Sequence, residues 1–124
     1  MGLALCLIIM AYGSSTINGR EVTSMSYTEQ QIVSEIKTHI QKSGLNFRDW
    51  YVGIAQDPQT RLFSDHNVSR ASGWWIYRTA PTSTEARNIE AHFVNVLGTD
   101  GGTGGGDFLS RAVYAYAKAT ATRE

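Results

Sequence analysis

The sequence is poor in cysteine, in net charge and in long apolar runs, and each shortage excludes a class of protein. Its single cysteine, Cys6, rules out an intrachain disulfide and a multi-cysteine zinc site. Eleven basic and eleven acidic residues cancel, which argues against a protein that coats nucleic acid by bulk charge but leaves room for a local basic cleft. The apolar fraction of 42% in 124 residues is that of a folded protein with one domain.

The longest apolar run, Leu3 to Tyr12, is too short to span a bilayer. It could be an export signal, although no Lys or Arg precedes it and no small-x-small cleavage site follows. It could also be an ordered helix or strand, or part of an extension upstream of a true start at Met25. We expect residues 1–24 to be an N-terminal extension and residues 25–124 to form one domain. We also expect a cytoplasmic protein without stable membrane association, with export as the alternative.

Beyond Met25, the first half of the chain predicts two helices and a strand. A capping box of Thr28 and Gln31 begins a helix that Gly44 ends. The β-branched and aromatic residues 50–55 predict a strand. Asp57 before Pro58 predicts the start of a helix of about ten residues that runs to His66.

The second half predicts two strands and a third helix. Residues 74–79 have strand composition, and a second capping box at Thr82 begins a helix that Gly98 ends. The glycine-rich residues 100–107 predict irregular structure, which we interpret as a flexible lid or connection. Residues 112–118 predict the last strand, with Tyr114 and Tyr116 on one face. Three strands alternating with short helices fit a small parallel, mixed or antiparallel sheet.

Glu90 is the most informative residue, because it interrupts the apolar stripe of the third predicted helix. It lies four residues after Ala86 and three before Phe93, so we expect it to point inward. An ionised carboxylate there is costly unless a cation, a metal or several donors meet it. The alternative is that Glu90 lies at the border of the stripe, where it reaches water or pairs with Arg61.

Upstream residues supply groups that complement this carboxylate. Tyr51 and Gly53 form the small face of the first strand, which leaves room for a ligand. His66 lies on the apolar side of its helix, and Arg61 lies at the edge of that side. Together these groups are the ingredients of metal-assisted phosphodiester cleavage. Taken singly, Arg61 fits a solvated helix residue, His66 fits a helix end, and the tyrosines fit cross-strand packing.

The ordered set resembles the GIY-YIG nuclease superfamily. Tyr51-Val52-Gly53 is similar to its YIG element, Arg61 to its catalytic arginine, and Ala86 with Glu90 to its A-x-x-x-E segment. His66 is similar to the histidine that follows the arginine, although it lies five residues after Arg61 where four is usual. The resemblance implies a divalent ion on the glutamate, transition-state stabilisation by the arginine, and proton transfer by tyrosine or histidine.

The order of the elements departs from that family. No GIY strand precedes Trp50, but Ala112-Val113-Tyr114 resembles one displaced to the C-terminus. The resemblance therefore implies a circularly permuted α+β fold: a small three-stranded mixed or antiparallel sheet flanked by three helices. Tyr114 would then be the candidate base. The sequence offers no match to the family's late asparagine, because Asn95 follows Glu90 too closely.

The expected function is divalent-metal-dependent phosphodiester hydrolysis of DNA or RNA, with Mg²⁺ or Mn²⁺ on Glu90. Tyr51, Arg61, His66 and Tyr114 are the expected catalytic residues. Gly53 and Trp75 are the expected substrate contacts, since a Trp-Trp step places one ring on each face of a strand. The alternative is a catalytically inactive module of the same type that binds nucleic acid or a protein partner.

Overall fold

The computed structural model describes residues 16–17, 20–21, 27–102 and 109–124. Strand β1 (Thr16–Ile17) pairs antiparallel with β2 (Arg20–Glu21). The apolar run from Leu3 to Tyr12 lies outside the described residues. Within the described part of the chain, no helix has the length and hydropathy that crossing a membrane requires.

The domain contains helices and strands close to the predicted bounds. In chain order they are α1 (Glu29–Ser43), the 3₁₀ turn η2 (Phe47–Asp49), β3 (Trp50–Ala55), the π-helix η3 (Thr60–Asp65), β4 (Trp75–Thr79), α2 (Ser83–Ala91), the π-helix η4 (His92–Leu97), β5 (Asp100–Gly101) and β6 (Ala112–Ala117). The predicted capping box at Thr28 is present, and the Thr82 side chain accepts a hydrogen bond from the Glu85 N–H. Gly44 and Gly98 end their helices with positive φ, as expected.

The prediction of three strands is wrong by one. The described sheet has four strands in the order β4-β6-β3-β5, antiparallel except for the parallel pair β3 and β5. The extra strand lies in the segment expected to be irregular throughout, where Asp100 and Gly101 pair with Tyr51 and Val52. Hydrogen bonding to a buried neighbouring strand overrides the low strand propensity of glycine. Residues 103–108 of the predicted lid lie outside the described residues.

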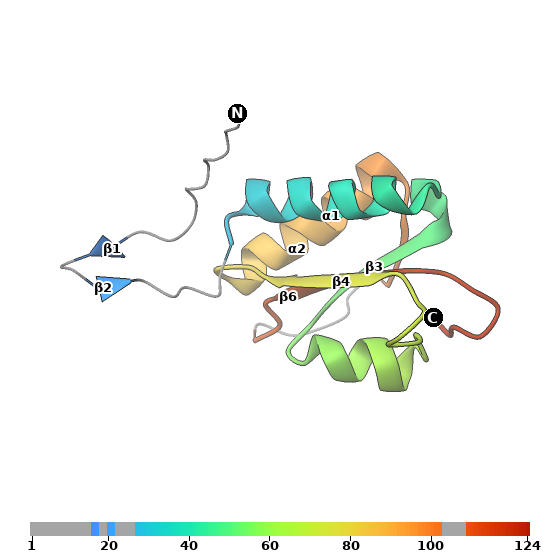
Figure 1. Cartoon of the computed structure of the whole chain (residues 1–124). Helices are drawn as coiled ribbons and strands as arrows, with labels where there is room; N and C mark the ends of the chain where they lie inside the picture. The colour runs from blue at the N-terminus through green and yellow to red at the C-terminus, as the bar shows by residue number, and fades with distance from the viewer. Residues whose placement is uncertain (1–15, 18–19, 22–26, 103–108) are drawn as a thin grey trace, which may run out of the picture.

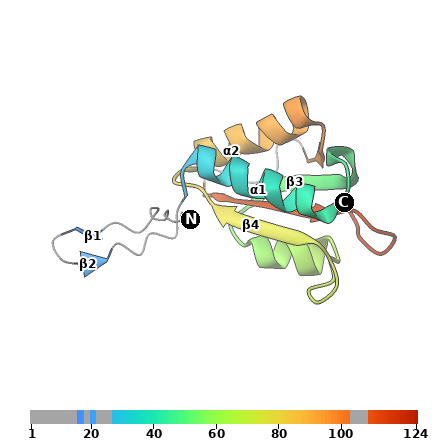
Figure 2. The same cartoon turned by 45° about the horizontal axis from the view of Figure 1, so that its top comes forward.

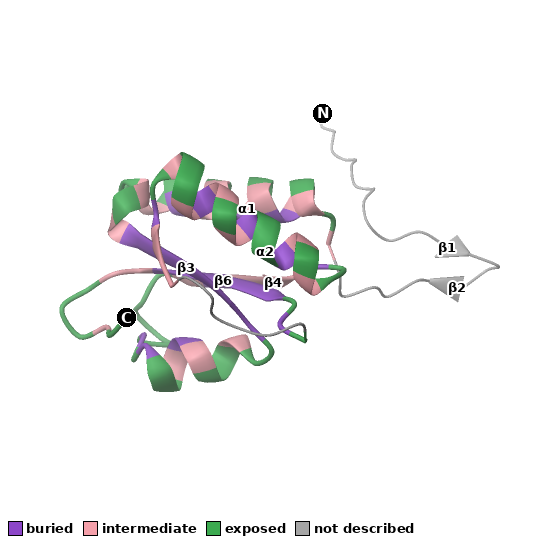
Figure 3. Ribbon diagram, turned by 180° about the vertical axis from the view of Figure 1, so that it is seen from behind, coloured by how far each residue is buried: buried purple, intermediate pink, exposed green. Residues whose placement is uncertain are grey.

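Helices α1 and α2 cover one face of the sheet, and η3 lies against the other (Figure 1, Figure 2). On the face toward α1 and α2, the side chains of β3 and β6 are aliphatic apart from Trp50. This face holds Trp50, Val52, Ile54, Val113 and Ala115 from the strands and Ile32, Ile36, Ile40, Ile89 and Phe93 from the helical segments. Burial is concentrated on the sheet and on the inner sides of these helices (Figure 3). This cluster is the main apolar core of the domain.

Candidate active site

The opposite face of the same two central strands carries phenols instead of aliphatic side chains. In the antiparallel register of β3 and β6, Tyr51 lies opposite Tyr116 and Gly53 lies opposite Tyr114. The Tyr51 ring stacks on the Tyr116 ring with centroids 5.2 Å apart. All three tyrosines are buried, with exposed fractions of 6% for Tyr51, 1% for Tyr114 and 0% for Tyr116. Side-chain alternation along a strand thus delivers three hydroxyls to one side of the sheet.

His66 lies among these tyrosines and is 3% exposed. Its Nε2 is 2.8 Å from the Tyr114 hydroxyl, and its Nδ1 is 2.6 Å from the main-chain carbonyl of Arg123. The imidazole ring also contacts the Tyr51 ring at a centroid distance of 4.8 Å. His66 does lie at the end of η3, as the simpler interpretation of the sequence expected, but there it is buried and hydrogen-bonded at both nitrogens.

The two hydrogen bonds of His66 fix its tautomer. A carbonyl oxygen only accepts, so Nδ1 must carry the proton that it donates to Arg123. Burial lowers the pKa of His66, and this effect together with the charge of Arg61 outweighs the opposing hydrogen bond to Arg123 and the charge of Asp65, so the ring is neutral near pH 7. Nε2 is then an acceptor for the Tyr114 hydroxyl. Tyr114 is thus a phenol whose proton is directed at a basic nitrogen.

Arg61 reaches this cluster from η3. A π-helical hydrogen bond joins the His66 N–H to the Arg61 carbonyl at 2.8 Å, five residues apart. In a π-turn, residues five apart occupy neighbouring positions, as residues four apart do in an α-helix. Arg61 forms an ion pair of 3.2 Å with Asp65 at the half-exposed surface. Desolvation lowers the pKa of Arg61, but its interactions with the Tyr114 hydroxyl and Asp65 together raise it.

Glu90 is half-buried at the end of α2. Desolvation raises its pKa to about 7, and Arg87 on the same helix only partly opposes the shift. Within the described residues no ion pair holds this carboxylate, so the pairing with Arg61 that the alternative interpretation allowed is not formed there. The inward orientation predicted from the apolar stripe is therefore present in part: the carboxyl is desolvated but still reaches the surface.

Arg61 and Glu90 act on the same two phenols. Burial raises the pKa of Tyr51, Arg61 opposes this shift, and Glu90 adds to it. Burial likewise raises the pKa of Tyr114 to about 12, with Arg61 again opposing and Glu90 again adding. The guanidinium and the carboxylate, which come from helices on different faces of the sheet, thus both lie within electrostatic reach of Tyr51 and Tyr114.

The glycine in β3 makes room for a side chain and not for a ligand. A Cβ atom on Gly53 would lie 2.6 Å from the Tyr114 hydroxyl oxygen and 2.7 Å from the ring carbon that bears it. The space that the sequence assigned to substrate is thus filled by Tyr114. Gly102 has the same role at the other phenol, because its Cβ would lie 2.7 Å from the Tyr51 hydroxyl oxygen.

Trp75, the tryptophan expected to contact substrate, is half-buried. It lies at the edge of the sheet face that carries Tyr51, Tyr114 and Tyr116, which we call the tyrosine face. Trp75 meets Phe63 edge-on at 4.9 Å and stacks with Tyr77 at 6.2 Å, and its N–H donates to the Arg70 carbonyl at 3.2 Å. Its neighbour Trp74 is more open, at 42% exposed, and meets His39 edge-on. The predicted alternation of the two rings is confirmed, and Trp75 is the one on the side of η3.

Two contributors to the site were missed by sequence reasoning. Tyr116 was expected only to pack, yet its hydroxyl lies 3.1 Å from Nδ1 of His66 and donates to the Arg123 carbonyl at 3.2 Å. Its shared face with Tyr114 was the available signal. The Arg123 carbonyl had no sequence signal, because any residue carries that group.

A separate groove of about 600 Å³ lies between α1 and α2. Val33, Lys37, Ile89 and His92 are among its lining residues. None of the expected site residues lines it, and the chemistry of its walls is mixed. The tyrosine face therefore remains the candidate site.

Comparison of this chain with models of protein families, with curated proteins and with solved structures found no match. The function of this chain is therefore inferred from its residues and their geometry.

Proposed function

We propose that this protein is a divalent-metal-dependent phosphodiesterase acting on DNA or RNA, with a circularly permuted GIY-YIG-like arrangement. The observation that carries the proposal is the hydrogen bond of 2.8 Å between Nε2 of His66 and the Tyr114 hydroxyl, a phenol whose pKa responds to the charges of both Arg61 and Glu90. A cation, an acid and a phenol directed at a base are the groups that phosphodiester hydrolysis requires.

The π-helical turn supports the likeness to that family at its weakest point. The family's histidine follows its arginine by four residues, whereas His66 follows Arg61 by five. Because η3 is π-helical, the extra residue is absorbed within the turn, and His66 still lies one turn from Arg61. Single π-turns are frequent at functional sites.

Glu90 is the residue that would hold Mg²⁺ or Mn²⁺. A carboxylate oxygen is the hard ligand that these ions prefer. The Glu90 carboxyl is desolvated and forms no ion pair within the described residues, so a bound cation would supply the positive charge that favours its ionised form. The described residues contain no cluster of three or more His, Cys, Asp or Glu side chains that could together hold a metal ion. Water and substrate oxygens would therefore complete the coordination of an ion on Glu90. When bound, the ion would polarise a phosphate oxygen and make bound water more acidic.

The protein's own groups divide the remaining work. Arg61, at the surface of the site, binds the phosphate and stabilises its charge in the transition state. Nε2 of His66 accepts the Tyr114 proton, and the Tyr114 oxygen then accepts a proton from the attacking water. Tyr51 packs over the imidazole and excludes bulk water. Near-zero net charge predicts weak affinity for plain duplex, so the substrate is a structured nucleic acid or is delivered by a partner.

The second candidate function is a module of the same type that binds nucleic acid or a protein without cleaving. The burial of Tyr114, at 1% exposed, favours this candidate, because a water molecule reaches its hydroxyl only if the site opens. Its partner would contact the edge of the tyrosine face, where Trp75 and Arg61 are partly exposed.

Cleavage assays on supercoiled plasmid and structured RNA, with Mg²⁺, Mn²⁺ or EDTA, separate the two functions. We expect Glu90→Ala and Arg61→Ala each to lower the metal-dependent rate at least 100-fold. Arg48→Ala is the matched control, because Arg48 is exposed on η2, away from the site. This variant should cleave at the wild-type rate. Equal cleavage by all four proteins indicates a contaminant and contradicts the proposal. Inactivity together with metal-independent binding supports the module.

A further inference from the structure

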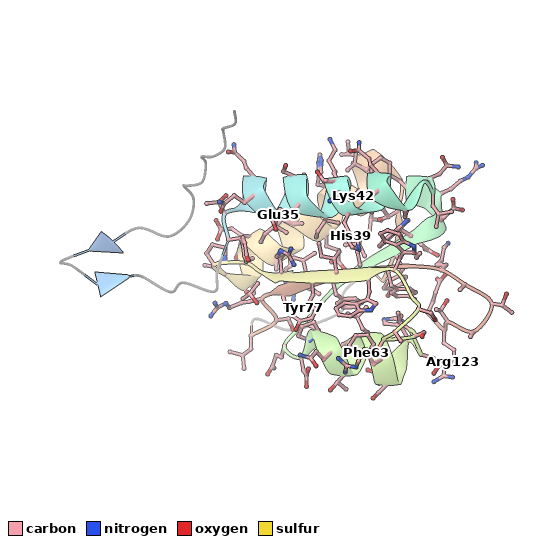
Figure 4. All side chains as sticks on the ribbon, in the orientation of Figure 1. Glu35, His39, Lys42, Phe63, Tyr77 and Arg123 are labelled. Atoms are coloured by element: carbon pink, nitrogen blue, oxygen red, sulfur yellow. The ribbon has the colours of Figure 1, made fainter. Side chains whose placement is uncertain are left out.

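The last residues of the chain fold back onto the loop that follows η3. The Arg123 N–H donates to the His66 carbonyl at 2.7 Å, and Nδ1 of His66 donates to the Arg123 carbonyl at 2.6 Å. Asn67 donates to the Ala121 carbonyl at 3.0 Å. In Figure 4, Arg123 lies beside the end of the helix that carries Phe63. Residues 119–124 therefore contact the loop at His66 and Asn67 through the main chain of His66 as well as through its imidazole ring.

We infer that residues 119–124 are a positioning element of the site, in which the Arg123 carbonyl holds His66 as the Nδ1–H tautomer. This leaves Nε2 to accept the Tyr114 proton. The tautomer is a property of the fold alone. Its meaning for catalysis rests on the proposed nuclease function.

Three contacts support this assignment of the proton. A distance of 2.6 Å between Nδ1 and a carbonyl oxygen requires a proton between them, because two lone pairs repel at that separation. The Tyr116 hydroxyl donates to the same carbonyl at 3.2 Å, which fixes the position of that oxygen. Tyr114 then meets an unprotonated Nε2 at 2.8 Å.

Residues 119–124 act on His66 through a main-chain carbonyl. This differs from a catalytic triad, in which the side chain of an acidic residue orients the histidine. Among the residues that the structure describes, the Arg123 side chain donates a hydrogen bond only to the Ser64 carbonyl, at 3.4 Å on the exposed surface. Replacement of the side chain should therefore leave His66 unchanged. Removal of the Arg123 N–H should displace the carbonyl, because that N–H is the other half of the pairing with His66.

The test is nitrogen-15 NMR of the His66 ring near pH 7.5, which reads the tautomer without any assay of cleavage. In the full-length protein we expect the Nδ1–H form to dominate. We expect removal of residues 119–124, and separately Arg123→Pro, to lower the ratio of Nδ1–H to Nε2–H about 2- to 10-fold, since each weakens a hydrogen bond that selects the tautomer. Tyr116→Phe should lower the ratio less, because it removes only the second donor to the carbonyl.

Two matched controls accompany these variants. Arg123→Ala keeps the main-chain groups, and Tyr77→Phe removes a phenol oxygen on the same sheet face that contacts Gln59 and not His66. Both should leave the ratio unchanged. A dominant Nε2–H form in the full-length protein would overturn the inference, as would an unchanged ratio in a folded Arg123→Pro variant. An inactive protein with the expected tautomer sinks the nuclease proposal and leaves the positioning element standing.

Discussion

The two faces of the central sheet are built by the same strands and yet differ in almost every physical property. Toward α1 and α2, β3 and β6 present Trp50, Val52, Ile54, Val113 and Ala115, which pack on helix isoleucines. Toward η3 they present tyrosines bonded to a buried histidine. Aliphatic burial stabilises the fold without directional bonds, whereas the tyrosine face depends on hydrogen bonds of defined geometry. We therefore expect the aliphatic face to supply most of the stability, and the tyrosine face is the one to which we assign the proposed chemistry.

The sharpest test of this comparison is Tyr114→Phe, which removes one hydroxyl oxygen from the tyrosine face. If the nuclease proposal holds, loss of the proton-accepting hydroxyl should slow metal-dependent cleavage about 100- to 10,000-fold, or about 3 to 5 kcal/mol in barrier height. The free energy of unfolding should fall by about 1 to 3 kcal/mol, because loss of the hydroxyl leaves Nε2 of the buried His66 without its partner. Single-turnover cleavage and urea denaturation measure the two quantities. A large loss of stability with an unchanged rate would reverse the roles assigned to the faces.

The complementary change is Ile36→Ala on the aliphatic face. Ile36 is fully buried in the main core, so its truncation should lower the free energy of unfolding by about 2 to 5 kcal/mol. The cleavage rate of the protein that remains folded should not change, because Ile36 lies on the opposite face of the sheet and contributes no atom to the site. Urea denaturation gives the stability, and assays well below the midpoint give the rate. A rate loss comparable to that of Tyr114→Phe would mean that the faces are not separable.

Gly53→Ala tests the contact that joins backbone to phenol. The added methyl group would overlap Tyr114, so we expect a loss of about 1 to 3 kcal/mol from overpacking. The loss should be smaller when Gly53→Ala is made in a Tyr114→Ala background, where the ring is absent. Thermal or urea denaturation of the four proteins in this cycle gives the coupling. Purely additive losses would show that Tyr114 does not occupy that space.

Glu90→Gln should have the smallest effect on the free energy of unfolding, and that effect should depend on pH in a distinctive way. The folded-state pKa of about 7 lies above the ordinary value of 4.5, so the fold favours the protonated acid. The stability that protonation gives is full below pH 4.5 and is lost as pH rises through 7. The Gln variant should therefore be more stable than wild type by about 1 to 2 kcal/mol at pH 8, after allowance for solvent screening, and equal to it near pH 4.5.

Metal addition sharpens the same measurement. Saturating Mg²⁺ at pH 8 should raise the melting temperature of the wild type, because the ion binds the folded ionised carboxylate, and should leave Glu90→Gln unaffected. An equal response of both proteins would remove Glu90 as the metal ligand. Wild type more stable than the variant at pH 8 without metal would show that Glu90 has a counter-charge.

Much of the architecture could be read from local patterns. Capping residues, glycine stops and period-two alternation predicted α1, α2, β3, β4 and β6, because those signals act within a few residues of the chain. The edge strand β5 could not be predicted, since Asp100 and Gly101 have low strand propensity and pair only because β3 lies beside them. Helix η3 was expected at its position, but its π-turn was not, since the widening has no reliable sequence signature.

The amino-acid sequence by itself determined which residue types each element presents to its two sides. Periodicity put tyrosines opposite aliphatics in β6 and turned Glu90 and His66 toward the interior. Only the tertiary structure decided which partners these groups meet. Sheet register filled the space at Gly53 with Tyr114, and chain reversal after β6 brought the Arg123 carbonyl to His66, 57 residues away in sequence. Side-chain direction is set by local backbone geometry, whereas pairings across such separations depend on how the whole chain packs.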